Sequence, residues 1–76
     1  MAAEKTYLLH CGTYTEIMTG TTEEARARVE ELFKVRHFDQ GGGWKMPSHW
    51  DKENKLYAHN ERHRATVVVG RIEVSR

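Results

Sequence analysis

Histidine and cysteine are the residue types here that most readily bind a metal, and the chain of 76 residues contains five histidines and one cysteine. His59 and His63 are separated by three residues, a spacing that recurs in zinc sites, with His49, His37 and Cys11 as candidate distant ligands. Complete zinc sites usually show two recognisable ligand pairs, and neither a CxxC motif nor a second pair accompanies this one. The alternative is a set of surface imidazoles that titrate near pH ~6.5. We therefore predict no metal site and no cofactor.

Nucleophilic catalysis would need a nucleophile, a base and a group that orients the base. Cys11 directly follows His10, but neighbouring side chains in a strand point to opposite faces, so the two do not form such a pair. Cys11 is better explained as a small packing residue. The paired acids Glu23–Glu24 and Glu30–Glu31 fall on a predicted helix surface, where they serve as caps and solubilising charge. The sequence therefore predicts no catalytic residues, and we expect that the protein is not an enzyme.

Aromatic and basic side chains alternate between residues 44 and 64, and this segment is the best functional candidate. Trp, Tyr and Arg are enriched at protein interfaces, and the same mixture can stack on bases and contact phosphates in single-stranded nucleic acid. An isoelectric point of about 8.0 is low for a nucleic-acid-binding domain, which favours a protein partner. The expected contact residues are Trp44, Lys45, His49, Trp50, Tyr57, Arg62 and Arg64. Trp44 and Trp50 could instead complete a small core.

Length and composition indicate one small domain over residues 1–76, since a chain of this size cannot support two cores. Hydrophobic residues make up 38% and charged residues 30%, so a partner chain could cover part of the apolar surface. The single cysteine excludes an intrachain disulfide, and neither a signal peptide nor a membrane-spanning stretch is evident. We expect a cytoplasmic protein that does not bind membranes.

Charge is distributed unevenly although the formal net charge is only +1. Residues 1–33 carry three basic and six acidic side chains, net −3, whereas residues 34–76 carry nine basic and five acidic ones, net +4. Such polarity can attract or orient a charged partner. If the two halves interleave in the fold, the charges instead cancel on the surface.

One amphipathic helix, predicted from Thr21 to His37, must position these groups. Thr21 and Glu24 fit a capping box, and acidic residues at the start with basic residues at the end match the helix dipole. Ala25, Val29, Leu32 and Phe33 share a face that should be buried, with the alkyl part of Arg36 along its edge. The exposed side, through Glu23, Glu30 and Glu31, is a second candidate partner surface.

Strands are predicted on both sides of the helix. Lys5–His10 and Thr15–Thr19 read as a hairpin with Ile17 as a core residue, or as one longer bulged strand. After a glycine run that could be a hinge or a tight connection, a short edge strand within residues 44–50 precedes strands at Lys55–His59 and Arg64–Ser75. In the last strand, Val68, Ile72 and Val74 should face the helix, while Val67 and Val69 point away. Gly70 either admits Phe33 closely or marks a bulge.

These patterns predict a small α+β domain with a mostly antiparallel sheet of three to five strands and one helix packed across it, in the order ββαβββ or βαβββ. For function, we expect a small non-enzymatic protein-binding module, for example a stoichiometric modulator or inhibitor of a larger protein. The first alternative is a nucleic-acid-binding module that uses the aromatic and basic surface. The second is a subunit of a symmetric homo-oligomer built by pairing an exposed edge strand.

Overall fold

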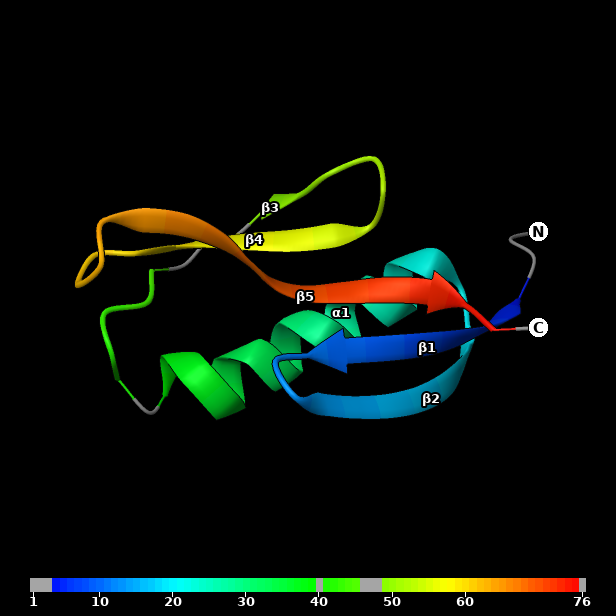
Figure 1. Cartoon of the computed structure of the whole chain (residues 1–76). Coiled ribbons are helices and arrows are strands. Elements are labelled where there is room, and N and C mark those ends of the chain that lie inside the picture. The colour runs from blue at the N-terminus through cyan, green and yellow to red at the C-terminus, as the bar shows by residue number, and fades with distance from the viewer. Residues whose placement is uncertain (1–3, 40, 46–48, 76) are drawn as a thin grey trace.

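The computed structural model describes residues 4–39, 41–45 and 49–75 and contains one five-stranded sheet with a helix across one face (Figure 1). Its strands are β1 (Lys5–Cys11), β2 (Tyr14–Gly20), β3 (His49–Trp50), β4 (Lys55–Asn60) and β5 (Ala65–Val74). The helix α1 (Thr22–Phe33) continues into a short π-helical turn, η1 (Lys34–Phe38). The predicted α+β class and the ββαβββ order are confirmed.

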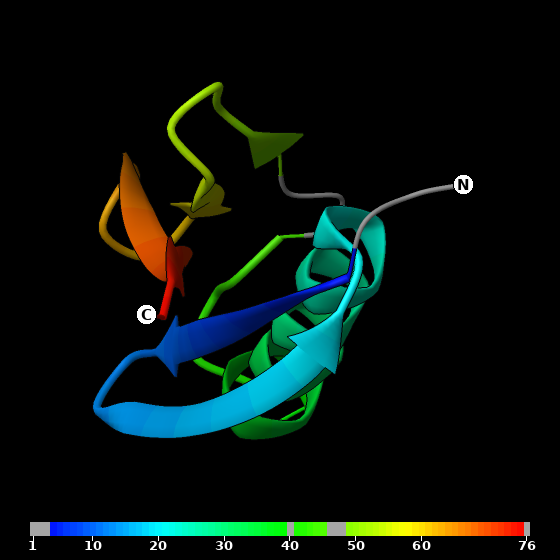
Figure 2. The same ribbon diagram turned by 90° about the vertical axis from the view of Figure 1, so that its right-hand side faces the viewer.

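The strand order across the sheet is β2-β1-β5-β4-β3, and every neighbouring pair is antiparallel. The first hairpin therefore forms one end of the sheet and the last three strands form the other, with β1 and β5 meeting between them (Figures 1 and 2). In the sheet, the two halves of the sequence lie side by side and do not interleave. Four of the six acidic residues of the first half, however, lie on the helix, which packs across β1 and β5.

The helix begins where the sequence predicts. The Thr21 hydroxyl accepts a hydrogen bond from the Glu24 backbone N–H, and the Glu24 carboxylate accepts one from the Thr21 N–H, which completes the capping box. The buried face consists of Ala25, Val29, Leu32 and Phe33, as predicted. The guanidinium of Arg36 lies 4.7 Å from the centre of the Tyr14 ring, at the edge of this face. Glu24 is thus engaged at the cap.

The β1–β2 hairpin turns through Gly12 and Thr13. Gly12 has a φ of +62°, as a glycine at the first central position of a type II′ turn does. On β1, Tyr7, Leu9 and Cys11 face the helix and are buried.

Ile17 does not lie in the core: it is 67% exposed, so that prediction is wrong. The turn pairs Ile17 with Leu8, which places both on the face away from the helix. The helix side of β2 is occupied by Glu16 and Met18, and the Glu16 carboxylate binds Arg28 of α1. Because this ion pair satisfies the carboxylate, β2 can turn its charged residue toward the helix and its isoleucine toward solvent.

A bulge in β5 changes which valines face the helix. Leu56 pairs with Gly70 and Tyr57 with Val68, so Val69 is the extra residue on β5. Val69 is therefore buried and Val68 exposed, the reverse of the prediction for both. Ile72 is buried as predicted, whereas Val74, the last residue of the strand, is 54% exposed.

Gly70 allows the helix to approach the sheet closely, which is one of the two roles predicted for it. The other, the bulge, lies at the neighbouring Val69. A Cβ at this position would lie 2.6 Å from Val29 Cγ1 and 2.9 Å from the His10 carbonyl oxygen. The side chain admitted is that of Val29, so the expectation that it would be Phe33 is wrong. The largest fully buried side chains around this contact are Phe33, Leu9, Leu56, Val29 and Cys11.

The glycine segment after the helix is tied to the β4–β5 hairpin. The buried Asn60 donates from Nδ2 to the Gly42 carbonyl and accepts from the His63 N–H, while the Glu61 N–H donates to the Gly43 carbonyl. A Cβ on Gly43 would lie 2.9 Å from Arg62 Cβ. Of the two sequence interpretations, the tight connection describes Gly42 and Gly43.

The short edge strand predicted between residues 44 and 50 corresponds to β3, and Trp44 forms an isolated bridge to Asn60. Residues 46–48 of that prediction lie outside the described part of the chain. None of the helical segments that the structure describes has the length and apolar composition needed to cross a bilayer.

Candidate binding surface on the open face of the sheet

The helix covers one face of the sheet, and among the described residues no helix or strand packs against the other. We call this second surface the open face. Side chains alternate between the two faces along each strand, and the bulge shifts this alternation in β5, so the pairing shows which residues lie on the open face. They include Leu8, His10, Ile17, His49, Lys55, Tyr57, Val68, Arg71 and Glu73.

A stacked aromatic pair lies on β3 and β4. The His49 and Tyr57 rings are nearly parallel, with an interplanar angle of 9° and centroids 5.3 Å apart. The two residues are direct cross-strand partners, the arrangement in which side chains approach most closely. Val68 pairs with Tyr57 on its other side and is 47% exposed. Three strands thus present a partly apolar row, His49–Tyr57–Val68.

Asp51 holds this row in place from the β3–β4 turn. Its carboxylate accepts hydrogen bonds from the backbone N–H groups of Lys55 and Glu53 and from the Tyr57 hydroxyl. The Lys55 and Glu53 N–H groups and the Tyr57 hydroxyl lower the pKa of Asp51 below its usual range, and the same hydroxyl contact raises the pKa of Tyr57. The Tyr57 ring is therefore fixed by its hydroxyl while its face stacks on His49.

A row of basic side chains runs across the neighbouring positions. His10 on β1 pairs with Arg71 on β5, which pairs with Lys55 on β4. Arg71 forms an ion pair with Glu73 at 2.9 Å, and His10 Nε2 lies 3.6 Å from the same carboxylate. Glu73 is the only acidic residue that the described strands carry on the open face. Because Arg71 and His10 lie against its carboxylate, its charge is already engaged.

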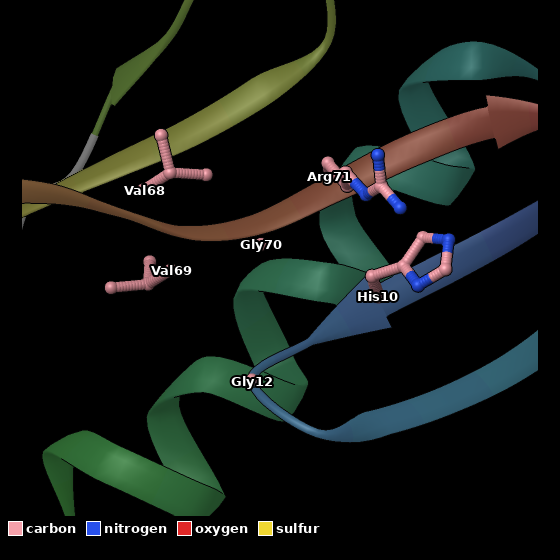
Figure 3. A pocket seen from close by; sticks show the side chains of 6 residues that line it. All are labelled: His10, Gly12, Val68, Val69, Gly70 and Arg71. Atoms are coloured by element: carbon pink, nitrogen blue, oxygen red, sulfur yellow. The ribbon is translucent and has the colours of Figure 1, made fainter.

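A shallow pocket of about 140 Å³ lies where β5 bends away from the end of β1. Its lining comprises His10, Gly12, Val68, Val69, Gly70 and Arg71 (Figure 3). The side chains of Val68 and Val69 diverge at the bulge (Figure 3), which opens this space beside the basic row. An apolar side chain of a partner would fit such a depression between Val68 and His10.

Further basic residues gather in the β4–β5 turn, which projects beyond the ends of β1 and β2 (Figure 1). Arg62 and Arg64 are exposed there, and Arg64 adopts a φ of +51°. Lys45 binds Glu61 at 2.9 Å. Within the described part of the chain, Lys55, Arg62 and Arg64 have no carboxylate within ion-pair distance. These three cations are available to an acidic partner.

The two tryptophans of the predicted contact segment pack against the core. The Trp44 and Phe33 rings meet edge-on, with their centroids 5.7 Å apart. The Arg26 guanidinium carbon lies over the Trp50 ring, 5.4 Å from its centroid. Both are partly buried, on the helix side of the sheet. They position β3 and the glycine segment and expose only part of their surface. The structure therefore separates Trp44 and Trp50 from Tyr57 and His49.

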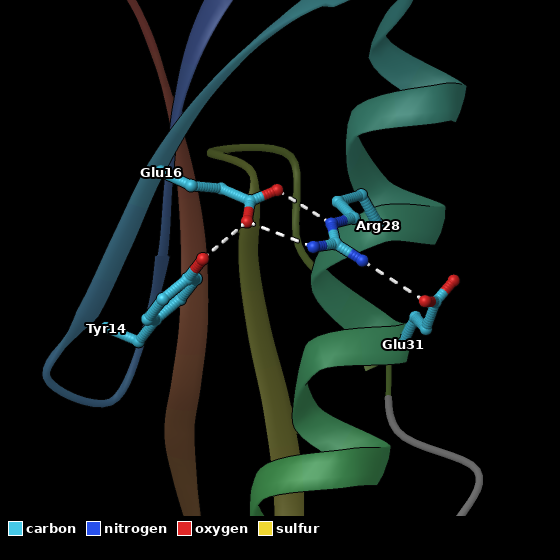
Figure 4. Close-up of polar contacts among 4 residues, drawn as sticks. All are labelled: Tyr14, Glu16, Arg28 and Glu31. Carbon is cyan, nitrogen blue, oxygen red and sulfur yellow. Dashed lines mark hydrogen bonds and ion pairs between the residues drawn. The ribbon is translucent and has the colours of Figure 1, made fainter.

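The predicted acidic surface lies on α1, away from the open face. Glu23 and Glu31 are exposed and Glu30 is half-buried. Glu31 accepts a hydrogen bond from Arg28, which also binds Glu16 through two contacts of 2.6 and 3.1 Å (Figure 4). Part of this acidic surface thus belongs to a network that attaches α1 to β2.

The histidines and the cysteine are dispersed. His59 Nδ1 lies 3.2 Å from the Thr66 hydroxyl, and His37 packs against Phe33 and Trp44, where burial lowers its pKa. Cys11 is buried as predicted, and burial raises the pKa of its thiol. Within residues 4–39, 41–45 and 49–75, no three His, Cys, Asp or Glu side chains come close enough together to hold a metal ion.

The predicted contact residues therefore fall into four places. Tyr57 and His49 lie on the open face, Arg62 and Arg64 at the β4–β5 turn, Trp44 and Trp50 against the core with Lys45 nearby, and the three glutamates on the helix. The residues predicted as contacts from the sequence did not include Arg71 or Val68. Alternation with Ile72 indicated the outward direction of Arg71, but nothing in the sequence revealed the bulge that exposes Val68.

Comparison with known proteins adds no relatives: no protein-family model, curated protein or solved structure gives a significant match to this chain.

Proposed function

We propose that the protein is a binding module that recognises another protein through the open face at β3, β4 and β5. The proposal rests chiefly on one observation: the stacked His49–Tyr57 pair and the exposed Val68 form a continuous row on a sheet face that no described element covers. Sheet faces that lack a covering layer and carry apolar side chains are common interaction sites. A module of this kind acts stoichiometrically, by occupying a surface, as a modulator or inhibitor does.

Charge indicates which kind of protein fits. Lys55 lies beside the aromatic row, and Arg62 and Arg64 lie at the end of the same hairpin, whereas Glu73 and Asp51 are engaged by neighbours within the chain. A complementary partner presents an apolar patch bordered by carboxylates. Such complementarity raises the association rate and excludes partners of the wrong charge.

The test is capture of the partner from its natural source by immobilised protein, with two matched charge reversals. Lys55→Glu changes the open face, and Lys34→Glu makes the same change at the end of the helix. We expect the first to weaken capture by about tenfold or more, because it would set a carboxylate against the acidic border of the partner, and a like-charge contact across an interface costs more than the ~1.4 kcal/mol that tenfold represents. The second should leave capture unchanged.

Equal loss with both variants, or retention with both, would contradict the proposed surface. Circular dichroism establishes that each variant is folded. The extract that contains the partner is divided, and one half is treated with nuclease before it meets the immobilised protein. Survival of the complex supports a protein partner.

The competing function is binding of single-stranded nucleic acid. The observation that favours it is the basic row His10–Arg71–Lys55 beside a stacked aromatic ring, a combination suited to phosphates and bases. It predicts loss of the complex on nuclease treatment and affinity that falls steeply with salt. Because Arg71 is already paired with Glu73, we place the protein partner first.

A further inference from the structure

β2 forms one edge of the sheet, and its properties invite pairing with another strand. It is seven residues long and pairs with β1 without a register shift. Natural edge strands usually block further pairing with proline, lysine, a bulge or a charge that points inward. β2 contains no proline and no lysine, and its only charged residue is Glu16.

The hairpin geometry determines which backbone groups are free at this edge. In a two-residue hairpin, the residues that close the turn exchange both hydrogen bonds, and the pattern then alternates along the ladder. Cys11 and Tyr14 close this turn. Glu16 and Met18 therefore direct their N–H and C=O groups toward β1, whereas Thr15, Ile17 and Thr19 direct theirs outward.

We propose that β2 pairs antiparallel with β2 of a second copy of this chain, about a two-fold axis at Ile17, and joins two five-stranded sheets into one. Ile17 is the middle residue of β2, so this axis uses the whole strand. Thr15 then lies opposite Thr19 of the second copy, and Ile17 lies opposite Ile17. An interface between identical chains requires such self-complementarity.

Neighbouring registers are worse. Moving the axis to Glu16 places that residue opposite itself in a non-hydrogen-bonded pair, where Cα atoms are only about 4.5 Å apart and like charges repel. Moving it to Met18 shortens the ladder to residues 16–20 and sets Ile17 opposite Thr19. With the axis at Ile17, Glu16 lies opposite Met18 and no like charges meet.

The pairing also buries Ile17, the most exposed large apolar side chain among those that the structure describes. Ile17 is 67% exposed, and Leu8 lies beside it on the open face. Across the axis, the two isoleucines and the two leucines form one apolar row, Leu8–Ile17–Ile17–Leu8. Cross-strand pairs of β-branched residues stabilise a sheet in this way. Threonines flank this row on the same face. Within one chain the Thr6 and Thr19 hydroxyl oxygens lie 3.3 Å apart, and Thr19 would lie opposite Thr15 of the second copy.

Glu16 points toward the helix and would ordinarily protect such an edge. Here its carboxylate is already bound by Arg28 at 2.6 and 3.1 Å and by the Tyr14 hydroxyl at 2.8 Å (Figure 4). Pairing therefore leaves no unpartnered charge at the interface. The helix lies mainly over β1 and β5 and contacts β2 less, which leaves space for the helix of the second copy on the same face.

Disulfide trapping tests the axis directly. In a hydrogen-bonded antiparallel pair, Cα atoms are about 5.5 Å apart, within the range that a disulfide spans. We expect I17C to form a covalent dimer on mild oxidation. V68C, at an exposed valine of β5, is the matched control and should form no disulfide-linked dimer. Cys11 is buried and contributes no crosslinks.

A mixing experiment tests the register. T15C alone and T19C alone should form no disulfide-linked dimer, whereas a mixture of the two should form a disulfide-linked dimer of one copy of each. Size-exclusion chromatography with light scattering over a concentration series should show a dimer of the unmodified protein, with a dissociation constant raised at least tenfold by I17K and unchanged by V68K.

A monomer at every concentration, together with crosslinking of I17C no faster than V68C, would overturn the proposal. If I17K does not fold, the cysteine variants still decide it. The inference is independent of the proposed partner surface, because β2 lies at the opposite end of the sheet from β3 and β4.

Discussion

At the scale of single residues, contacts between the helix and the sheet depend on one small side chain. Gly70 faces Val29 so closely that any side chain would collide with Val29 Cγ1 and the His10 carbonyl oxygen. The same glycine follows Val69, the extra residue of the bulge. The bulge determines which face of the sheet each residue of β5 before Val69 points to. Packing and register therefore meet at one position.

We expect Gly70→Ala to lower the free energy of unfolding by about 1–3 kcal/mol, because inserting a methyl group into a tightly packed contact forces its neighbours apart. Urea denaturation measures the change. In a Val29→Ala background, the same substitution should cost less, since the closest side-chain atom has been removed. Additive effects of the two substitutions would contradict the proposed contact.

The directions of three side chains, Ile17, Val68 and Val69, could not be predicted from the sequence. The direction of Ile17 depends on the turn register and on Arg28 being available to bind Glu16, a residue twelve positions away in the chain. Hydrophobicity alone favours Ile17 in the core, and the turn register together with the tertiary ion pair reverses that preference. Val68 and Val69 exchange their predicted positions because bulges leave no reliable pattern in a valine-rich strand.

At the scale of elements, the start of the helix, its buried face and the strand positions followed from capping, periodicity and β-branched composition. These signals are local. The grouping of the candidate site residues was not predictable, because it depends on which face each strand presents and on the strand order. Trp44 and Trp50 have the composition of contact residues but serve chiefly to attach peripheral segments to the core.

The contact between Arg28 and Glu16 joins two elements and predicts a pH dependence. The Arg28 hydrogen bond, with that of Tyr14, lowers the pKa of Glu16 in the folded state. Its stabilising contribution is thus fully present above the pKa of an unfolded glutamate, about 4.3, and is lost as the pH falls through the lower folded value. Asp51, whose pKa is also lowered, acts in the same direction.

Stability should therefore fall as the pH is lowered below about 4.5, and Glu16→Gln should make that decline shallower. At neutral pH the substitution should cost about 0.5–1.5 kcal/mol, since a partly exposed ion pair contributes modestly. Urea midpoints measured from pH 7 to pH 3 give both quantities. A decline as steep as in the unmodified protein would exclude this role for Glu16.

At the scale of the whole molecule, the strands of the first and second halves of the sequence lie on opposite sides of the β1–β5 pair, and the acidic helix packs across that pair. The helix supports the sheet from one side and leaves the other open. Two surfaces result: the aromatic and basic row on β3, β4 and β5, and the open edge at β2. We propose a protein of complementary charge as the partner of the first and a second copy of the chain as the partner of the other.

The proposed binding surface is tested most sharply by lysine acetylation of the protein, free and in the captured complex, read residue by residue by mass spectrometry. Lys55 borders the proposed surface, and Lys34 lies exposed at the end of the helix. We predict strong protection of Lys55 in the complex and unchanged labelling of Lys34. Protection of Lys34 with Lys55 still freely labelled would place the partner on the helix side and contradict the account.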